Sequence, residues 1–323
     1  MADLVTLDIG GTNARFALAS VAADGSVQLG EVVTLHTGAF PSLEAAWGEF
    51  ASRQSGALPR AAAIAFAGPV FGGAARLTNS SWEIRTDELA KALELDKATL
   101  INDFAAVAHA ANALPPEDFL HLAGPDIGLP REGTISLIGP GTGLGVAHFH
   151  RIAGTCHVQA TEGGHIGFAP VDDLDDRILA RLRHRHDRVS LERVVSGPGI
   201  AEIYAVLSER DAGQPPALDA DSIWRLGIAG QDAIASAAVD HFCLLLGRAA
   251  GDIALAQGAA GVVIAGGTGL SLGERLRGPA FGEGFRAKGR YEAMMAGIPV
   301  KLLRHPQPGL LGAAAVLVAE HWP

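Results

Sequence analysis

Two stretches of this chain share one pattern, in which an apolar strand enters a Gly-Thr turn and a second apolar strand leaves it. Residues 7–18 read LDIGGTNARFAL, and residues 135–149 read ISLIGPGTGLGVAHF. The second pair, Gly141-Thr142, follows the first, Gly11-Thr12, by 130 residues. Glycine has no Cβ, so backbone N–H groups in such a turn can come close to an anion. The repeat therefore predicts a duplicated fold that clamps a nucleotide between its two halves.

The first turn also carries side chains that suit phosphate binding. Thr12 and Asn13 add hydrogen-bond donors directly after Gly10 and Gly11. Asp8 lies just before the turn, where a carboxylate could hold a hydrated Mg²⁺ ion beside the phosphates. The same residues would suit an ordinary β-hairpin, whose turn requires glycine. The first turn alone leaves both interpretations open, and the second copy favours the nucleotide.

The charge and the cysteine content exclude several classes of protein. The chain has 323 residues, enough for two domains with separate cores. Its net charge of −10 argues against nucleic acid or an anionic membrane as a partner. Cys156 and Cys243 are the only cysteines, too few for a disulfide framework or a zinc cluster. No charged segment followed by an apolar stretch precedes the first strand, so we expect a soluble, cytoplasmic protein without a signal peptide.

Apolar patterning and turn residues predict alternating strands and helices, as in an α/β fold. We expect a strand at 27–36, another at 70–77 that pairs with the apolar strand 61–67, and a long helix at 231–257. The double proline Pro115-Pro116 ends the preceding helix and marks the predicted domain boundary. The expected domains are a small α/β domain at 1–113, completed by a C-terminal helix within 305–323, and a large α/β domain at 114–304.

Asn102 and Asp103 lie where a predicted strand ends and a predicted helix begins. In one interpretation Asp103 only caps that helix, which is a common use of aspartate. In the other, the helix dipole keeps the Asp103 carboxylate ionised. An ionised carboxylate could accept the proton of a sugar hydroxyl while that oxygen attacks a γ-phosphate. These residues by themselves leave both interpretations open.

A second group of ionisable residues is Glu162-Gly163-Gly164-His165. A Glu and a His three residues apart can bind a metal ion from a helix, but the two glycines between them disfavour a helix. A loop that presents both side chains to a polyhydroxylated ligand is the simpler interpretation. Glu192 is a third candidate, although a lone glutamate usually lies on the surface.

Taken in order, these motifs resemble those of the bacterial glucokinase family, which belongs to the hexokinase–actin–Hsp70 ATPase superfamily. The resemblance covers nearly the whole chain, and its landmarks are Asp8–Arg15, Leu77–Asn79, Ile101–Phe104, Gly141–Gly145, Glu162–His165, Ser196–Gly199, Ala265–Gly267 and Pro308–Gly312. It implies an α/β fold of two actin-like ATPase (ribonuclease-H-like) domains with a central cleft. It also implies ATP-dependent phosphorylation of glucose at the 6-hydroxyl to glucose 6-phosphate, the first step of glycolysis, with Asp103 as the general base.

The resemblance further implies which residues bind the substrates. Glucose would be bound by Asn102, Asp103, Glu162, His165 and Glu192. ATP would be bound by Asp8, Gly10, Gly11, Thr12 and Asn13 on one side and by Gly141 and Thr142 on the other, with Gly266 and Gly267 against the adenosine. Mg²⁺ would be held mainly by the nucleotide and by water, with no dedicated metal site in the protein. Relatives are commonly dimers, so a homodimer is expected.

Three residues depart from the family pattern. Pro140 replaces the small residue usual before the second Gly-Thr turn and so removes one backbone N–H. Thr161 stands where glycine often precedes the Glu-Gly-Gly-His loop, and Thr268 replaces an apolar residue. Pro140 could alter phosphate affinity and Thr268 adenine packing, but neither removes a sugar-binding side chain. The Cys-rich zinc motif of the related repressor–kinase group is absent.

Other interpretations are weaker. Residues 269–273 match the G-x-S-x-G motif of serine hydrolases, but three residues separate them from their strand and no aspartate follows Ser271. The glycines at 141–145 lack the G-x-G-x-x-G spacing of dinucleotide-binding folds, and the chain has no P-loop motif. A non-catalytic, sugar-sensing regulator on the same fold would need an appended partner-binding segment. Within the enzymes, another hexose kinase is the alternative.

Overall fold

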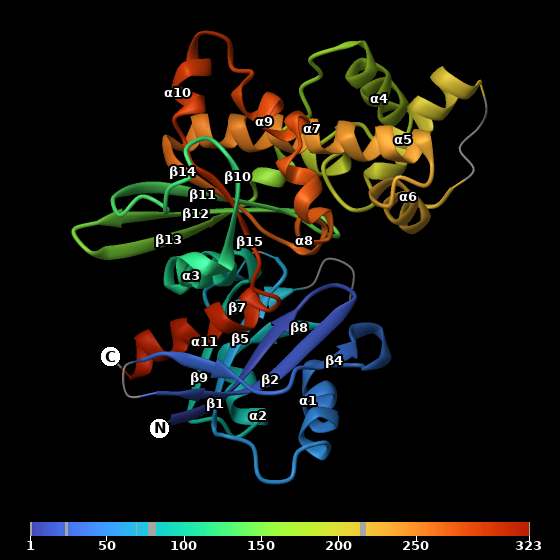
Figure 1. Ribbon diagram of the computed structural model, residues 1–323. Helices are drawn as coiled ribbons and strands as arrows, with labels where there is room; N and C mark the ends of the chain where they lie inside the picture. Colours follow the sequence, from blue (N-terminus) through green and yellow to red (C-terminus); the bar gives the residue numbers. More distant parts are fainter. Residues whose placement is uncertain (1, 23–24, 69, 77–81, 214–217, 323) are drawn as a thin grey trace. The chain divides into compact units, whose positions relative to one another are not determined.

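The computed structural model describes residues 2–22, 25–68, 70–76, 82–213 and 218–322. The chain divides into two compact units, of which unit 1 consists of residues 1–114 and 305–323 and unit 2 of residues 115–304. Each unit contains a six-stranded β-sheet with helices packed on it (Figure 1).

In unit 1, the sheet is centred on the strand that leads into the first Gly-Thr turn. Its strands are β1 (Ala2–Ile9), β2 (Asn13–Val21), β3 (Val27–Leu29), β4 (Val33–His36), β5 (Ala61–Phe66) and β9 (Lys97–Asn102). The order is β3-β2-β1-β5-β9, with β4 also paired to β2. β1 runs antiparallel to β2 and parallel to β5, which is parallel to β9.

The sheet of unit 2 repeats this arrangement. Its strands are β10 (Phe119–Ala123), β11 (Gly133–Pro140), β12 (Leu144–Ile152), β13 (Thr155–Thr161), β14 (Ala259–Ile264) and β15 (Val300–Leu303). The order β13-β12-β11-β14-β15 matches β3-β2-β1-β5-β9, and β10 adds an antiparallel edge strand. Residues 12–20 and 142–150 also have the same succession of exposed, half-buried and buried positions. The duplication predicted from the two turns is therefore confirmed.

Helices cover both faces of the unit 1 sheet, because β1 is apolar on both sides. These helices are α1 (Leu43–Ser52), α2 (Thr86–Ala92), α3 (Asp103–Ala113) and α11 (Pro308–His321). Leu4 packs with residues of α3 and α11, and Leu7 packs with residues of α1 on the opposite face. The C-terminal helix belongs to unit 1, where it packs closely on α3 and β5 (Figure 1).

Unit 2 has a long central helix. Its helices are α4 (Asp173–Arg183), α5 (Ile200–Leu207), α6 (Ala220–Ile228), α7 (Ala233–Gln257), α8 (Gly267–Leu272), α9 (Pro279–Arg286) and α10 (Glu292–Ala296). The structure adds α6, α8, α9 and α10, which the sequence did not predict. α7 is long and apolar enough to cross a membrane by length and composition, but more than half of it is buried in this unit. A Cβ on Gly247 or Gly251 would collide with backbone oxygens of α9, so both glycines permit close helix packing.

Two strand predictions were wrong. The predicted strand 27–36 is interrupted at Gly30, whose N–H donates to the Leu18 carbonyl, so that β3 and β4 pair with different parts of β2. The segment after β5 does not pair with β5. Instead, β6 (Val70–Phe71), β7 (Ala74–Arg76) and β8 (Glu83–Arg85) form a separate sheet. Gly72 and Gly73 have positive φ and fold β6 back onto β7, which explains the change of partner. The landmark Leu77–Asn79 lies outside the described residues.

A partly buried histidine on α3 predicts how stability depends on pH. Burial lowers the pKa of His109 from its ordinary 6.5, against the opposing effect of Glu320. From about pH 6.5 downward the unfolded chain binds this proton more readily than the folded chain does. The free energy of unfolding therefore decreases as the pH is lowered, until the pH reaches the folded-state pKa. When the pH is lowered from about 7 to about 5, the Tm of His109→Gln should therefore fall less than the Tm of the wild type. His157→Gln, at an exposed position on β13, is the control, and an unchanged pH response of His109→Gln would contradict the prediction.

Candidate active site

The first Gly-Thr turn is held in place by hydrogen bonds, and its tip is exposed. The Gly10 N–H donates to the Asn13 carbonyl at 2.9 Å, which forms the turn. Thr37 anchors it, because its N–H donates to Thr12 O at 2.9 Å and its hydroxyl to Gly10 O at 3.1 Å. Gly11 and Thr12 are exposed, and a Cβ on Gly11 would meet no atom within 4 Å. The turn therefore offers backbone and hydroxyl donors with free space above Gly11.

Asp8 is held beside this turn by two neighbours. Its cross-strand partner Arg15 donates to Oδ2 at 3.3 Å. On another side, a Cβ on Gly309 at the start of α11 would lie 3.0 Å from Oδ2, so the helix comes close to the carboxylate because this residue is glycine. Burial raises the pKa of Asp8, and the Arg15 guanidinium opposes that rise. The result is a half-buried carboxylate partly neutralised by one guanidinium.

Asn102 and Asp103 lie at the same edge of the sheet as Asp8. Ile9, Phe66 and Asn102 are successive partners across the parallel strands β1, β5 and β9, so the three strands end level with one another. The Asn102 side chain donates to Gly68 O at 3.0 Å and accepts the N–H groups of Phe104 and Ala105. Asn102 is therefore the N-cap of α3, and the interpretation that Asp103 is the cap was wrong.

Asp103 is instead the first residue of α3 and is half-buried. One of its oxygens, Oδ1, accepts the N–H of Phe104 at 2.8 Å, which restrains the side chain. Since the cap is supplied by Asn102, the carboxylate of Asp103 is not required to start the helix. The structure thus separates the helix cap from the predicted base.

In unit 2, three segments meet at the second Gly-Thr turn: the turn itself, the loop that contains Gly197 and the loop that follows β14. The Gly141 N–H donates to Gly143 O at 2.8 Å, and the Gly197 N–H donates to Gly141 O at 2.7 Å. A Cβ on Gly266, whose φ is +83°, would lie 2.7 Å from Pro140 O. Glycine at 266 therefore lets the loop after β14 approach the turn closely. Thr142 and Gly267 are exposed beside it, and a Cβ on Gly141 would meet no atom within 4 Å.

The Glu-Gly-Gly-His segment lies directly against β12. A Cβ on Gly164 would overlap the Leu144 carbonyl, and one on Gly163 would lie 2.9 Å from the Val146 side chain. The two glycines are thus required for the loop to pack there, which the sequence did not reveal. Glu162 and His165 remain more than half exposed, with His165 Nε2 3.9 Å from Glu162 Oε2. Both polar groups are available to a ligand.

Glu192, in the short helix η4 (Leu191–Arg193), reaches the second Gly-Thr turn. Its Oε2 accepts the N–H of Leu144 at 2.9 Å, and the side chain is half-buried. The Leu144 carbonyl faces Gly164 on the other side. Unit 2 therefore brings the predicted phosphate turn and the predicted sugar loop into contact through one residue, Leu144.

The predicted residues fall into two groups, one in each unit. Unit 1 holds Asp8, Gly10, Gly11, Thr12, Asn13, Asn102 and Asp103. Unit 2 holds Gly141, Thr142, Glu162, His165, Glu192, Gly266 and Gly267. Among the described residues, no cluster of three His, Cys, Asp or Glu side chains could hold a metal ion.

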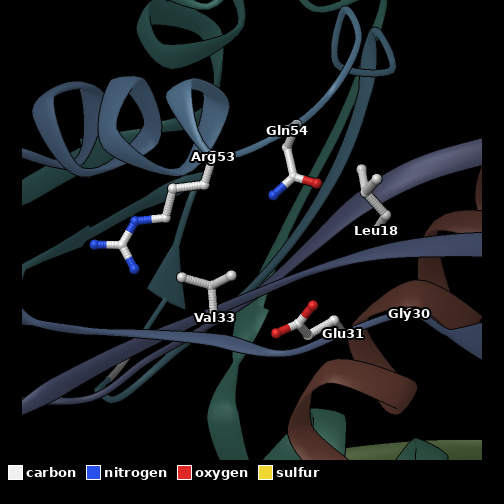
Figure 2. Close-up of a pocket in the computed structure, with 6 residues that line it drawn as sticks. All are labelled: Leu18, Gly30, Glu31, Val33, Arg53 and Gln54. Carbon is white, nitrogen blue, oxygen red and sulfur yellow. The ribbon is translucent and has the colours of Figure 1, made fainter.

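Figure 2 shows a pocket elsewhere in unit 1, where Arg53 and Gln54, directly after α1, lie opposite Glu31 and Val33. Leu18 and Gly30 complete its lining, so it contains none of the predicted site residues. Arg53 is already paired with Glu49, with Nη2 2.6 Å from Oε1. This pocket is therefore separate from the candidate site.

Several residues that shape the site were not singled out from the sequence. Thr37 acts through contacts with residues more than 20 positions away, and no local motif marks it. Arg15, Gly143, Gly197 and Gly309 lie inside quoted motifs, so their positions were visible but their contacts were not. Ser271, the serine of the hydrolase motif, lies in α8 and its hydroxyl donates to Gly267 O at 3.0 Å, as in an ordinary helix.

Known proteins resemble this chain over its whole length. The family model for glucokinase matches residues 5–320. A glucokinase of Zymomonas mobilis is 50% identical over 319 residues, covering 99% of this chain and 98% of the relative. A crystal structure of glucokinase from an Antarctic psychrotroph has a TM-score of 0.83 at 37% identity and covers 99% of both chains. A ROK family glucokinase from Streptomyces griseus, solved with glucose and AMPPNP, shares the fold, with a TM-score of 0.68 at 19% identity over 98% of this chain and 99% of that one.

Proposed function

This chain belongs to the glucokinase family, and we propose on that basis that it transfers the γ-phosphoryl group of ATP to the 6-hydroxyl of glucose. The products are glucose 6-phosphate and ADP. The observation that carries this function is 50% identity to a glucokinase over almost the full length of both chains. The family resemblance seen in the sequence is confirmed, as is the α/β fold of the actin-like ATPase type.

The proposed roles in catalysis follow the two groups of residues. Asn102, Glu162, His165 and Glu192 hold the hydroxyl groups of the sugar, and Asp103 accepts the proton of the attacking 6-hydroxyl. This role is supported by the position of Asp103 at the start of α3, where the helix dipole stabilises a negative charge. Phosphoryl transfer needs mainly positioning and charge stabilisation, which a pre-formed set of donors provides.

ATP would be held by the two Gly-Thr turns, with its adenosine against Gly266 and Gly267. The free space above Gly11 and Gly141 supports this placement, since phosphates need backbone groups that no Cβ shields. Mg²⁺ bound to the nucleotide would neutralise charge on the phosphates. The half-buried Asp8 carboxylate suits such an ion through a water molecule, and we propose no separate metal site.

The direct test is a panel of hexoses with Mg-ATP, in which ADP release is measured by a coupled assay. We expect glucose to give the highest kcat/KM, with mannose, fructose and glucosamine as weaker substrates. A site that hydrogen-bonds each hydroxyl discriminates against an inverted or missing one, because a buried polar group is then left unpaired. Higher kcat/KM for another hexose would reassign the substrate, and no turnover of any hexose would refute the kinase.

Replacing Gly11 or Gly141 with valine tests the phosphate turns. The added side chain occupies the space above the turn, so KM for ATP should rise and kcat should fall, each by about tenfold or more. Because a Cβ at either position meets no atom within 4 Å, both variants should fold, and glucose should bind normally without nucleotide.

Gly56→Val and Gly128→Val are matched controls for these variants, one in each unit. Both glycines are exposed, and a Cβ at either position would also meet no atom within 4 Å. Their ATP kinetics should equal those of the wild type. If Gly11→Val or Gly141→Val also kept normal ATP kinetics, the corresponding turn would not be a phosphate site.

We also propose that the enzyme is cytoplasmic and homodimeric, with neither nucleic acid nor a membrane as a partner. The net charge of −10 supports the absence of polyanionic partners, because like charges repel. The homodimer rests on the family resemblance alone. Light scattering coupled to size-exclusion chromatography measures the mass in solution, and a monomer at micromolar concentration would refute the dimer.

We propose, finally, that the two compact units correspond to the two functional domains, residues 1–113 with 305–323 and residues 114–304. The observed division between residues 114 and 115, directly before Pro115, supports this assignment.

A further inference from the structure

The carboxylate of Glu192 contacts the backbone of the second Gly-Thr turn at one peptide group. Its Oε2 accepts the N–H of Leu144 at 2.9 Å. The carbonyl of the same peptide group belongs to Gly143, and it accepts the N–H of Gly141 at 2.8 Å. The two hydrogen bonds lie at opposite ends of one rigid plane, so Glu192 fixes the orientation of the peptide that closes the turn.

The approach of Glu192 to the turn depends on glycine at position 143. A Cβ on Gly143 would overlap Oε2 of Glu192 and lie 3.0 Å from its carboxyl carbon. Any other residue at this position would therefore displace the carboxylate or deform the turn. Since the backbone of Glu192 is itself held by η4, where the Arg193 N–H donates to Ser190 O at 3.1 Å, the contact is pre-formed.

We propose that Glu192 is a positioning residue for the nucleotide as well as a ligand of the sugar. One oxygen holds the peptide between Gly143 and Leu144, and the other is available to a sugar hydroxyl. The turn thereby keeps the shape that binds phosphate, and the sugar and nucleotide sites of unit 2 share one carboxylate. This inference rests on the proposed function, in which residues 141–143 contact the phosphates and Glu192 contacts glucose.

The inference predicts different results for two substitutions of the same side chain. In Glu192→Gln the amide oxygen can still accept the Leu144 N–H, so the turn should keep its shape. In Glu192→Ala the peptide loses its partner. A hydrogen bond to a charged group contributes enough free energy for about a tenfold change in a binding constant. We therefore expect Kd for Mg-ADP, measured by calorimetry without sugar, to rise about tenfold in Glu192→Ala and less than about threefold in Glu192→Gln.

Gly143→Ala provides a second, independent variant in which the carboxylate is kept but pushed away from the turn. It should weaken Mg-ADP binding and, because Glu192 moves, should also weaken glucose binding measured without nucleotide. Gly141→Ala is the matched control in the same turn, since its Cβ has free space, and it should leave glucose binding unchanged. If Glu192 had a purely structural role, its substitution by alanine would lower Tm, but substitution by glutamine would not restore the affinity for Mg-ADP.

Wild-type Mg-ADP affinity in a folded Glu192→Ala would overturn the inference, as would equal weakening in the Gln and Ala variants. If Glu192→Ala does not fold, Gly143→Ala provides the test. Normal affinity of Gly143→Ala for both Mg-ADP and glucose would then overturn the inference. Because the Mg-ADP titration needs no sugar, its result is independent of the hexose panel. If glucose is not phosphorylated but glutamine still rescues Mg-ADP binding, the proposed function fails while the positioning role stands.

Discussion

Replacing Asp103 with asparagine is expected to lower kcat for glucose phosphorylation by about 10²–10⁴-fold, the usual contribution of a general base. Loss of orientation of the attacking hydroxyl could increase the effect further. The asparagine has nearly the same shape and can still accept the Phe104 N–H through its oxygen. The N-cap of α3 is supplied by Asn102, so the helix should start normally. Glucose should still bind, with a modest loss of affinity.

Asp173→Asn is the matched control for this variant. Asp173 is the first residue of α4 and follows an Asp172 N-cap, just as Asp103 follows Asn102, but it is exposed and outside the candidate site. The measurements are kcat and Tm of the same preparations. Both variants should keep a Tm close to that of the wild type, and only Asp103→Asn should lose turnover. Near-normal kcat in a folded Asp103→Asn would remove the general base from the mechanism.

The second large effect is expected for Gly312→Ala. Gly312 lies on α11 where that helix touches α3, and a Cβ would overlap the carbonyl oxygen of Ala106. Ala106 is one turn from Asp103, so the overlap can be relieved only by a shift of α11 or of the first turns of α3. Overpacking of this kind should reduce the free energy of unfolding by about 3 kcal/mol. For a chain of 323 residues the corresponding fall in Tm is about 4 °C.

Gly48→Ala is the control for this substitution. Gly48 is an exposed residue within α1, and a Cβ there would meet no atom within 4 Å. Alanine should stabilise that helix by about 0.5–1 kcal/mol because glycine loses more backbone entropy on folding. Thermal unfolding by circular dichroism should therefore give opposite shifts for the two variants. An unchanged Tm in Gly312→Ala would show that α11 and α3 can adjust their packing at little cost.

Local sequence patterns were enough to predict much of this fold. The two Gly-Thr turns could be recognised because a tight turn between apolar strands depends on sterics within a few residues. The helix at Asp103 and the C-terminal helix followed from caps, prolines and apolar runs, which are also local signals. The family resemblance then rested on the order of such motifs along the chain, and the relatives confirm it.

Partners distant in sequence were decided only by the tertiary structure. The segment after β5 pairs within its own small sheet because Gly72 and Gly73 turn the chain back, whereas apolar patterning allowed it to pair with β5. Asn102 rather than Asp103 caps α3, a choice between neighbouring residues that depends on side-chain geometry.

Leu144 is the clearest case. Its N–H is bound by Glu192, 48 residues further along the chain. Neither position carries a pattern that indicates the other, because such a contact exists only when η4 is packed beside the turn. Steric limits within a few residues can be recognised in each segment of the sequence, whereas a contact of this kind depends on sheet register and on the packing of distant segments.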